Sequence, residues 1–291
     1  MLDLSPSVPG WGNPFACKLS ALGTLTAEDL TALSDLARHR RQFPAGQELL
    51  YQGQTSQCAY VVQSGWSLSY KVLQSGARQI IDFHIPGDFM GLRSILLRIT
   101  DHSVETITSV QASLITWAEL MTWFQQKPRL GTAVLWAASR DEAMVVERLI
   151  DLGRRSAAER MAHFLLELAV RLRRVGIGDS AGYPCPLSQY LLADALGLSS
   201  IHVNRVLREL REEGLVTFQN GQVVFNNHRG LVDYAGFDGT YLDQDTPRPR
   251  NLPSPGVAPM RAASSQKASY PEASLRDPTA RSRGSATAVN A

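Results

Sequence analysis

The stretch that decides the fold lies at Leu187–Phe225 and reads LSQYLLADALGLSSIHVNRVLRELREEGLVTFQNGQVVF. Its first part predicts a short helix, because apolar residues recur on one helical face. These residues are Leu191, Leu192, Ala195 and Leu196. Ser188 is the expected N-cap, and Gly197 ends the helix where a residue without a Cβ can turn sharply.

A second helix and a hairpin follow this turn. Ser199 is the expected N-cap of the second helix, and Gly214 ends it. Its inner face is formed by Val203, Val206, Leu207 and Leu210. The strand-like runs 216–218 and 223–225 flank Asn220-Gly221, a dipeptide typical of a tight hairpin turn.

Helix, glycine turn, helix and hairpin in this order predict a winged helix-turn-helix. The small Ala193 and Gly197 suit the close approach of two helices at a steep angle. Two helices and a turn alone would equally fit an ordinary helical hairpin inside a larger domain. The hairpin and a polar outer side on the second helix favour DNA binding. That side carries His202, Asn204, Arg205 and Arg208.

Length and composition allow two domains with real cores, since the chain has 291 residues, of which 44% are hydrophobic. The formal net charge is only +2, so a nucleic-acid surface must be local. No apolar run approaches the roughly 20 residues of a membrane span, and the start lacks the features of a signal peptide. Three scattered cysteines fit a reducing compartment. We therefore expect a cytoplasmic protein without membrane contact.

The N-terminal half predicts a β-roll. Residues 1–20 are expected to be an irregular arm, followed by a helix that Thr26 caps. Between 38 and 117, short β-rich runs alternate with glycines, which is typical of an all-β barrel or roll. The expected strands are 48–51, 58–63, 66–73, 78–85, 103–108 and 112–117. We assign residues 21–126 to this sensor domain.

Helices follow at 118–126 and 130–152. The longer helix carries an apolar stripe at three- and four-residue steps, namely Leu135, Ala138, Val145, Leu149 and Leu152. We interpret this stripe as the seam of a homodimer and assign 127–153 to a dimerisation helix. Packing of the stripe on its own β domain is the alternative.

A further helix is predicted at 157–175, and residues 154–235 form the predicted DNA-binding domain. The segment 236–291 becomes rich in Pro, Ser, Ala, Gly and Arg, so we expect a disordered tail. The predicted fold class is α+β: a jelly-roll-like β-roll, a long connecting dimer helix and a C-terminal winged helix-turn-helix.

This order of parts resembles the Crp/Fnr family of bacterial transcription regulators over about residues 20–230. The motifs that carry the resemblance are Phe43-Pro44-Ala45-Gly46, Gly53, Ser64-Gly65, Pro86-Gly87-Asp88-Phe89 and Val203-Asn204-Arg205. The resemblance implies a homodimer on a near-palindromic DNA site, a β-roll that senses a signal, and RNA polymerase as a partner.

Two departures speak against cyclic AMP. The family's cyclic-AMP-binding members hold the ribose with a Glu and the phosphate with an Arg. The matching positions here are Leu92 and His102. An apolar side chain accepts no hydrogen bond, and histidine is a weaker, titratable donor. Arg93 could face an anion, but it does not match the family arginine.

An iron–sulfur cluster is not expected, because Fnr-type sensors use four cysteines and this chain has Cys17, Cys58 and Cys185. Haem is not expected either. His84 and His102 lie in or near the roll, but a lone histidine there is more often structural.

The resemblance also suggests which residues read bases. Arg205 matches the family's last arginine and can bond twice to guanine. Ile201 stands where a base-reading glutamate is common, so it can touch a thymine methyl but cannot accept from cytosine. His202 and Asn204 complete the predicted base-reading set. Phosphate contacts are expected from Ser188, Gln189, Ser199, Ser200 and Arg208.

Two other function classes remain open at this point. The helix-turn-helix could serve protein interaction in a small-molecule or redox adaptor. A cupin-like metal enzyme could use Asp82 and His84, but two ligands are too few. We therefore predict a DNA-binding regulator without enzymatic activity, and the sequence leaves its signal open.

Overall fold

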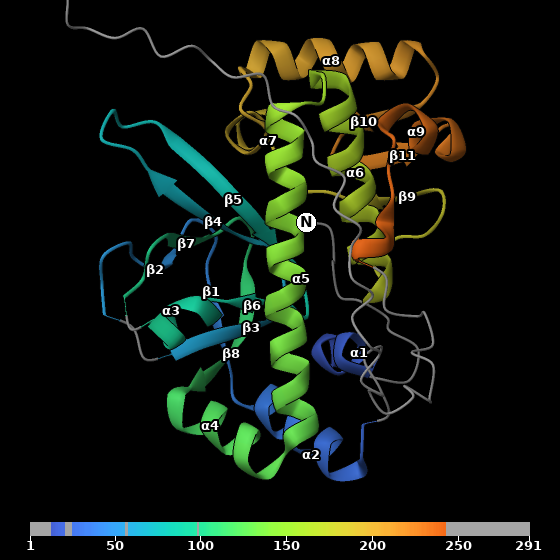
Figure 1. The fold of residues 1–291 in the computed structure, drawn as a ribbon. Coiled ribbons are helices and arrows are strands. Elements are labelled where there is room, and N and C mark those ends of the chain that lie inside the picture. The colour runs from blue at the N-terminus through green and yellow to red at the C-terminus, as the bar shows by residue number, and fades with distance from the viewer. Residues whose placement is uncertain (1–12, 21–24, 56–57, 98, 243–291) are drawn as a thin grey trace, which may run out of the picture. The chain divides into compact units, whose positions relative to one another are not determined.

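The structure, a computed structural model, describes residues 13–20, 25–55, 58–97 and 99–242. Its N-terminal part is a roll of two antiparallel sheets, with strand orders β1-β8-β3-β6 and β2-β7-β4-β5 (Figure 1). The strands are β1 Arg40–Phe43, β2 Glu48–Leu50, β3 Cys58–Ser64, β4 Ser67–Val72, β5 Arg78–His84, β6 Phe89–Met90, β7 Ser103–Thr106 and β8 Val110–Thr116. The predicted β-roll is confirmed.

The strand prediction missed β1 and β6. Strand β1 reads RRQF, and its first three residues are exposed because it pairs only with β8 at the edge of a sheet. A polar edge strand has no apolar alternation to reveal it. Strand β6 has two residues, which is too short for any periodicity.

Four helices flank the roll: α1 Pro14–Ser20, α2 Ala27–Arg38, α3 Leu92–Leu97 and α4 Trp117–Gln126. Thr26 caps α2 as predicted, in a reciprocal capping box with Asp29. The irregular arm predicted for 1–20 is wrong for its last part, which is helical. Phe15 and Leu19 are buried there among apolar residues of α2 and α4, so tertiary packing forms this helix. Residues 1–12 lie outside the described part.

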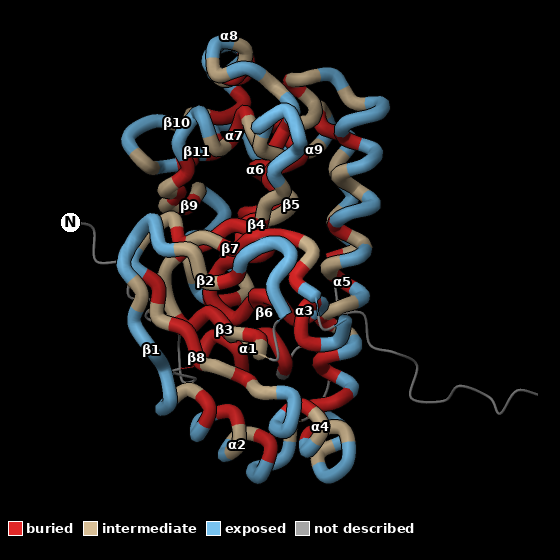
Figure 2. Tube along the Cα trace, turned by 90° about the vertical axis from the view of Figure 1, so that its left-hand side faces the viewer, coloured by how far each residue is buried: buried red, intermediate tan, exposed pale blue. Residues whose placement is uncertain are grey.

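Helix α5, Pro128–Gly153, begins with proline at its first turn, where the missing N–H costs nothing. One side of it packs into the core with Leu130, Ala133, Val134 and Ala137. The opposite side is largely exposed (Figure 2). Among the described residues no helix is long and apolar enough to span a membrane.

The C-terminal module consists of helices and a three-stranded sheet of order β10-β11-β9. Its elements are α6 Ala157–Arg174, β9 Gly182–Pro184, α7 Gln189–Leu196, α8 Ser200–Glu212, β10 Val216–Gln219, β11 Gln222–Phe225, α9 His228–Ala235 and η1 Gly239–Tyr241. The hairpin turn is as predicted, with positive φ at both Asn220 and Gly221. Helix α4 ends at Gln126 and helix α5 at Gly153, and the domain boundaries at these two positions stay a prediction.

The predicted tail begins too early at 236. Gly236 caps α9 in the left-handed conformation, but the chain then continues into η1 and the buried Leu242. The Tyr241 hydroxyl donates to Glu167 Oε2 at 2.9 Å. A few aromatic residues thus order a segment whose composition alone looked loop-like. Residues 243–291 lie outside the described part.

Candidate nucleic-acid interface and sensor cavity

The turn between α7 and α8 has the geometry of a helix-turn-helix. Ser188 Oγ accepts from the Leu191 N–H at 3.3 Å, and Ser199 Oγ accepts from the His202 N–H at 3.2 Å. Both serines are therefore N-caps, as predicted. Gly197 has φ +64°, and a Cβ there would meet Leu152 Cδ2 at 3.2 Å. The glycine thus serves both the left-handed turn and the close packing on α5.

One face of α8 is free for recognition. Val203, Val206 and Leu210 are fully buried, whereas the residues at 201, 204, 205 and 208 are exposed. Positions 204 and 205 lie one helical turn after 201, and 208 lies one turn after them. Ile201 on this face is 81% exposed. The structure thus brings Ile201, Asn204, Arg205 and Arg208 onto one accessible face.

His202 lies beside this face and contacts it. Its Nε2 is 3.0 Å from Arg205 Nη2, and because a guanidinium can only donate, the ring nitrogen is the acceptor in this hydrogen bond. The two residues are three apart on one helix, where side chains meet. The sequence predicted both as separate readers of bases and did not predict their contact.

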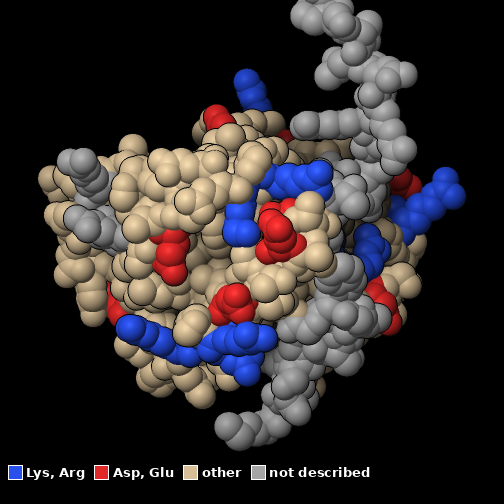
Figure 3. Space-filling model, turned by 90° about the horizontal axis from the view of Figure 1, so that it is seen from below, with Lys and Arg blue, Asp and Glu red and all other residues tan. Residues whose placement is uncertain are grey.

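Four of the five predicted phosphate-binding residues lie at the two helix starts, and the fifth, Arg208, lies further along α8. Gln189 is exposed, and the Ser188 and Ser199 hydroxyls cap their helices while their own protons remain available to an acceptor. Tyr190, beside them, is 73% exposed and was missed, because an aromatic residue near an apolar stripe looks like core. Figure 3 shows the opposite end of the protein, where Lys, Arg, Asp and Glu are scattered without a patch of one sign.

The outer side of α5 carries the predicted seam. Leu135, Val145, Leu149 and Leu152 are all exposed, with Leu149 at 71%, and Ala138 is half-buried. Val146 and Ile150 extend the exposed apolar side and were not in the predicted stripe. The alternative, packing on its own β domain, describes Ala138, which packs against the apolar core and lines the cavity together with Val145, so the dimer seam stays a prediction.

A cavity of about 400 Å³ lies between the roll and α5. It is lined by Ser69, Ile81, Asp82, His84, Phe89, Gly91, Leu92, Arg93, Leu96, His102, Ala138, Asp141, Glu142, Met144, Val145 and Arg148. His84 is 8% exposed, and its Nε2 has no hydrogen-bond partner among the described residues. Burial lowers the pKa of both His84 and His102, so both imidazoles are neutral near pH 7.

Comparison with known proteins agrees with this geometry. Residues 40–127 match the model of the cyclic nucleotide-binding domain, and residues 159–234 match the model of the Crp-like helix-turn-helix domain. The nitrogen fixation regulation protein FixK of Bradyrhizobium diazoefficiens is 31% identical over 209 residues, which make up 72% of this chain and 86% of that protein. The chain belongs to the Crp/Fnr family.

Other members are similar over most of their length. The transcriptional activator protein FnrA of Stutzerimonas stutzeri is 27% identical over 226 residues, covering 76% of this chain and 91% of FnrA. The structure of FixK2 from Bradyrhizobium japonicum aligns with a TM-score of 0.61 and 26% identity, over 68% of this chain and 98% of that one. This Crp/Fnr chain is thus a DNA-binding transcription regulator.

The cavity does not fit a cyclic nucleotide, although it lies in the domain named after that ligand. Leu92 forms part of its wall and offers no acceptor for a ribose hydroxyl. His102 Nδ1 is 2.7 Å from Asp101 Oδ1, and Arg93 Nη2 is 2.8 Å from Asp101 Oδ2. His102 and Arg93 are therefore already engaged by Asp101, and Arg148, a third cation in the cavity wall, is bonded through its Nη2 to Glu167.

The described residues contain no group of three or more His, Cys, Asp or Glu that could hold a metal ion. The three cysteines lie on separate elements, Cys17 on α1, Cys58 on β3 and Cys185 after β9. Burial raises the pKa of the Cys185 thiol to about 12, which makes it unreactive. This arrangement fits neither an iron–sulfur cluster nor the cupin-like metal site.

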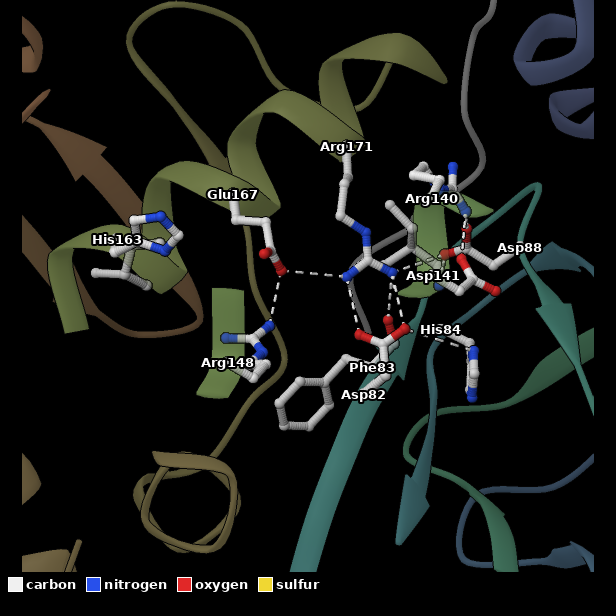
Figure 4. A network of polar contacts seen from close by, with 12 residues as sticks. Asp82, Phe83, His84, Asp88, Arg140, Asp141, Arg148, His163, Glu167 and Arg171 are labelled. Carbon is white, nitrogen blue, oxygen red and sulfur yellow. Dashed lines mark hydrogen bonds and ion pairs between the residues drawn. The ribbon is translucent and has the colours of Figure 1, made fainter. Parts of the chain in front are cut away.

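The sequence missed a cluster of buried charges around Asp88 (Figure 4). Asp88 accepts from Lys18, from Arg140 Nη2 at 2.8 Å and from Arg171 Nη2 at 3.0 Å. Burial would raise the pKa of Asp88, but these three cations hold it well below its ordinary value. The only signal in the sequence is on α6, where the titratable residues at 163, 167 and 171 recur every four positions.

Proposed function

We propose that this regulator acts as a homodimer that reads a near-palindromic DNA site. The observation that carries the proposal is the exposed apolar side of α5, on which Leu149 is 71% exposed. Large exposed aliphatic residues in a row mark an interaction surface. A second copy supplies the same stripe, so the contact is self-complementary. Two recognition helices would then meet two half-sites about one DNA turn apart, roughly 34 Å.

Base reading is assigned to Ile201, His202, Asn204 and Arg205, which lie on or beside the free face of α8. Arg205 is suited to guanine O6 and N7, and Ile201 to a thymine methyl. Ser188, Gln189, Ser199, Ser200 and Arg208 are assigned to phosphates. These contacts position the protein without adding sequence information.

The sensor domain is proposed to respond to a signal other than cyclic AMP, an iron–sulfur cluster or haem, or to no signal at all. Support comes from the engaged His102 and Arg93 and from the separated cysteines. We propose that the chain has no catalytic activity. We also propose that it acts in the cytoplasm and that RNA polymerase is its partner in transcription. A redox adaptor is disfavoured, because the raised pKa of Cys185 suppresses its thiolate.

The test combines sedimentation with DNA protection. Wild-type protein should sediment as a dimer at micromolar concentration and protect two half-sites. Leu149→Glu places a charge in the apolar seam and should shift the protein to monomer, with at least about tenfold weaker binding to the full site. Thr122→Glu, at an exposed position of α4, is the control and should change neither result. A wild-type monomer that protects one half-site would overturn the dimer proposal.

A further inference from the structure

Arg171 connects the DNA-binding module to the sensor roll. It lies near the end of α6, inside the segment that matches the Crp-like helix-turn-helix domain, yet its guanidinium enters the roll. Arg171 Nη1 is 3.0 Å from Asp82 Oδ1, and Nη2 donates to the Phe83 carbonyl oxygen at 2.7 Å and to Asp88 at 3.0 Å (Figure 4). The side chain is 2% exposed. One residue thus makes directed bonds to β5 and to the β5–β6 turn.

We propose that Arg171 is a latch that fixes the orientation of the DNA-binding module on the sensor roll. The apolar contact between these parts, such as Phe83 against Phe164 with ring centroids 5.7 Å apart, attracts without specifying a direction. A planar guanidinium with several charge-assisted bonds does specify one. The latch therefore determines how the module sits, while the apolar contact holds it close.

The other polar contacts between the two parts are nearer to solvent. Arg78 donates from Nε at 2.9 Å and from Nη2 at 2.8 Å to Asp194 Oδ2 on α7, but about a third of each side chain is exposed. Gln79 Nε2 donates to the Ala195 carbonyl oxygen at 3.3 Å. Solvent-exposed ion pairs contribute little. Among the described residues, the orientation of the DNA-binding module on the roll therefore depends mainly on the buried Arg171.

The buried polar cluster continues along α6 to Glu167, which bonds to residues of other elements. Glu167, fully buried, accepts from Arg148 Nη2 of α5 at 2.7 Å and from the Tyr241 hydroxyl. Helix α6 is thus held to α5 and to η1 through Glu167 and to the roll through Arg171. Only Arg154, Arg155 and Ser156 separate α5 from α6, so a small rotation at this connection would move the whole module.

A buried ionic cluster is weak evidence for stability, because well-packed apolar residues often serve as well or better. The directed bonds of this cluster select one orientation of the DNA-binding module on the roll among several of similar free energy. Asp82 also lines the cavity, so the latch and the sensor cavity share one carboxylate. An occupant of the cavity that bonds to Asp82 would compete directly with Arg171.

The consequence for DNA rests on the proposed dimer. If Arg171 fixes the orientation of each DNA-binding module on its sensor roll, it also fixes the distance and rotation between the two recognition helices of the dimer. Each base pair inserted between half-sites moves one of them by about 3.4 Å and turns it by about 34°. A latched dimer should therefore prefer one spacing, and an unlatched dimer should tolerate several.

The test uses binding to duplexes whose half-sites differ only in spacing. Removal of Arg171 alone leaves two carboxylates under-compensated and threatens folding, so the main variant is the charge-balanced Arg171→Met with Asp82→Asn. Wild type should prefer its best spacing about tenfold or more over spacings one or two base pairs away. The double variant should reduce this preference to about threefold or less, with an unchanged base preference inside each half-site. Arg173→Met, an exposed neighbour on α6, should behave as wild type.

Limited trypsin digestion provides a second measurement that needs no DNA. The exposed Arg154 lies in the α5–α6 connection, and cleavage after it should be several-fold faster in the double variant than in wild type or Arg173→Met. A folded double variant with wild-type spacing preference and wild-type cleavage would overturn the latch. If wild type itself binds only single half-sites, the proposed dimer fails, and the cleavage rates still decide the latch.

Discussion

Helices α8 and α6 both carry polar side chains in a row, but their surroundings give the two rows opposite roles. On α8 the row ends in solvent, with Arg205 exposed beside Ile201. On α6 His163, Glu167 and Arg171 are all at most 2% exposed, because α5, α9, η1 and the roll surround this helix. The same periodicity therefore marks an exposed face in one helix and an internal connection in the other. Neighbours far away in the sequence decide which.

The largest expected effect is the loss of stability when a buried charge is removed, compared with the removal of an exposed one. Asp88→Asn leaves Lys18, Arg140 and Arg171 without their shared anion in a desolvated site. We expect the free energy of unfolding to fall by about 3–5 kcal/mol, measured by urea titration. The control is Asp35→Asn, which removes the exposed partner of Arg38 and should stay within about 0.5 kcal/mol. An equal loss of unfolding free energy in the two variants would contradict this difference between buried and exposed charges.

The next effect concerns the end of the ordered chain. A stop after Gly236 removes Phe237, Tyr241 and Leu242, and with them the hydroxyl that bonds to Glu167. The expected cost is about 2–4 kcal/mol from lost burial and an under-satisfied carboxylate. A stop after Leu242 should leave the unfolding curve unchanged. Identical stability of the two truncated chains would show that this segment does not support α6.

These two effects also show how far the sequence could predict the structure. The winged helix-turn-helix, the roll and the long helix follow from caps, turn residues and apolar periodicity, which are local signals. The exposed side of α8 follows as well, because Val203, which is buried, and Arg205, which is exposed, differ by about 200° around one helix. The Asp88 cluster joins α1, the β5–β6 turn, α5 and α6, and no periodicity in one segment encodes such a meeting. The η1 segment was missed for the same reason.

A smaller effect distinguishes the buried His163 from an exposed histidine. Burial, with Arg155 and Arg148 nearby, lowers the pKa of His163 to about 3, since Arg155 already pairs with the two closest carboxylates. The unfolded chain binds this proton below about pH 6.5 and the folded chain does not, so stability falls as the pH drops. We expect this group to account for about 1–2 kcal/mol between pH 6.5 and 5.

The measurement is urea unfolding of wild type and His163→Gln at these two pH values. The variant should show a flatter pH dependence, whatever its stability at pH 7. His84 and His102, whose pKa values burial lowers, add a slope of the same sign, whereas Asp141 and Asp151, whose pKa values burial raises, add one of the opposite sign. The difference between the two proteins isolates the part that depends on His163. An unchanged slope would mean that His163 is already protonated in the folded protein.

The smallest expected effect concerns cyclic AMP, for which we expect no binding. Calorimetry with cyclic AMP should give no binding heat up to about 1 mM ligand, because Leu92 cannot accept from a ribose and Asp101 already holds Arg93 and His102. Unfolding temperatures with and without the nucleotide should also agree. A micromolar dissociation constant would show that the cavity rearranges to free a cation.

The central claim, that the exposed face of α8 reads DNA, is tested most directly by selection of binding sites from randomised half-sites. Wild type, Arg205→Ala and the control Arg173→Ala are compared under one salt condition. Arg205→Ala should lose the preference at one base pair, worth about 1–3 kcal/mol, and keep the rest of the motif. Arg173→Ala should return the wild-type motif. An unchanged motif with Arg205→Ala would contradict the claim.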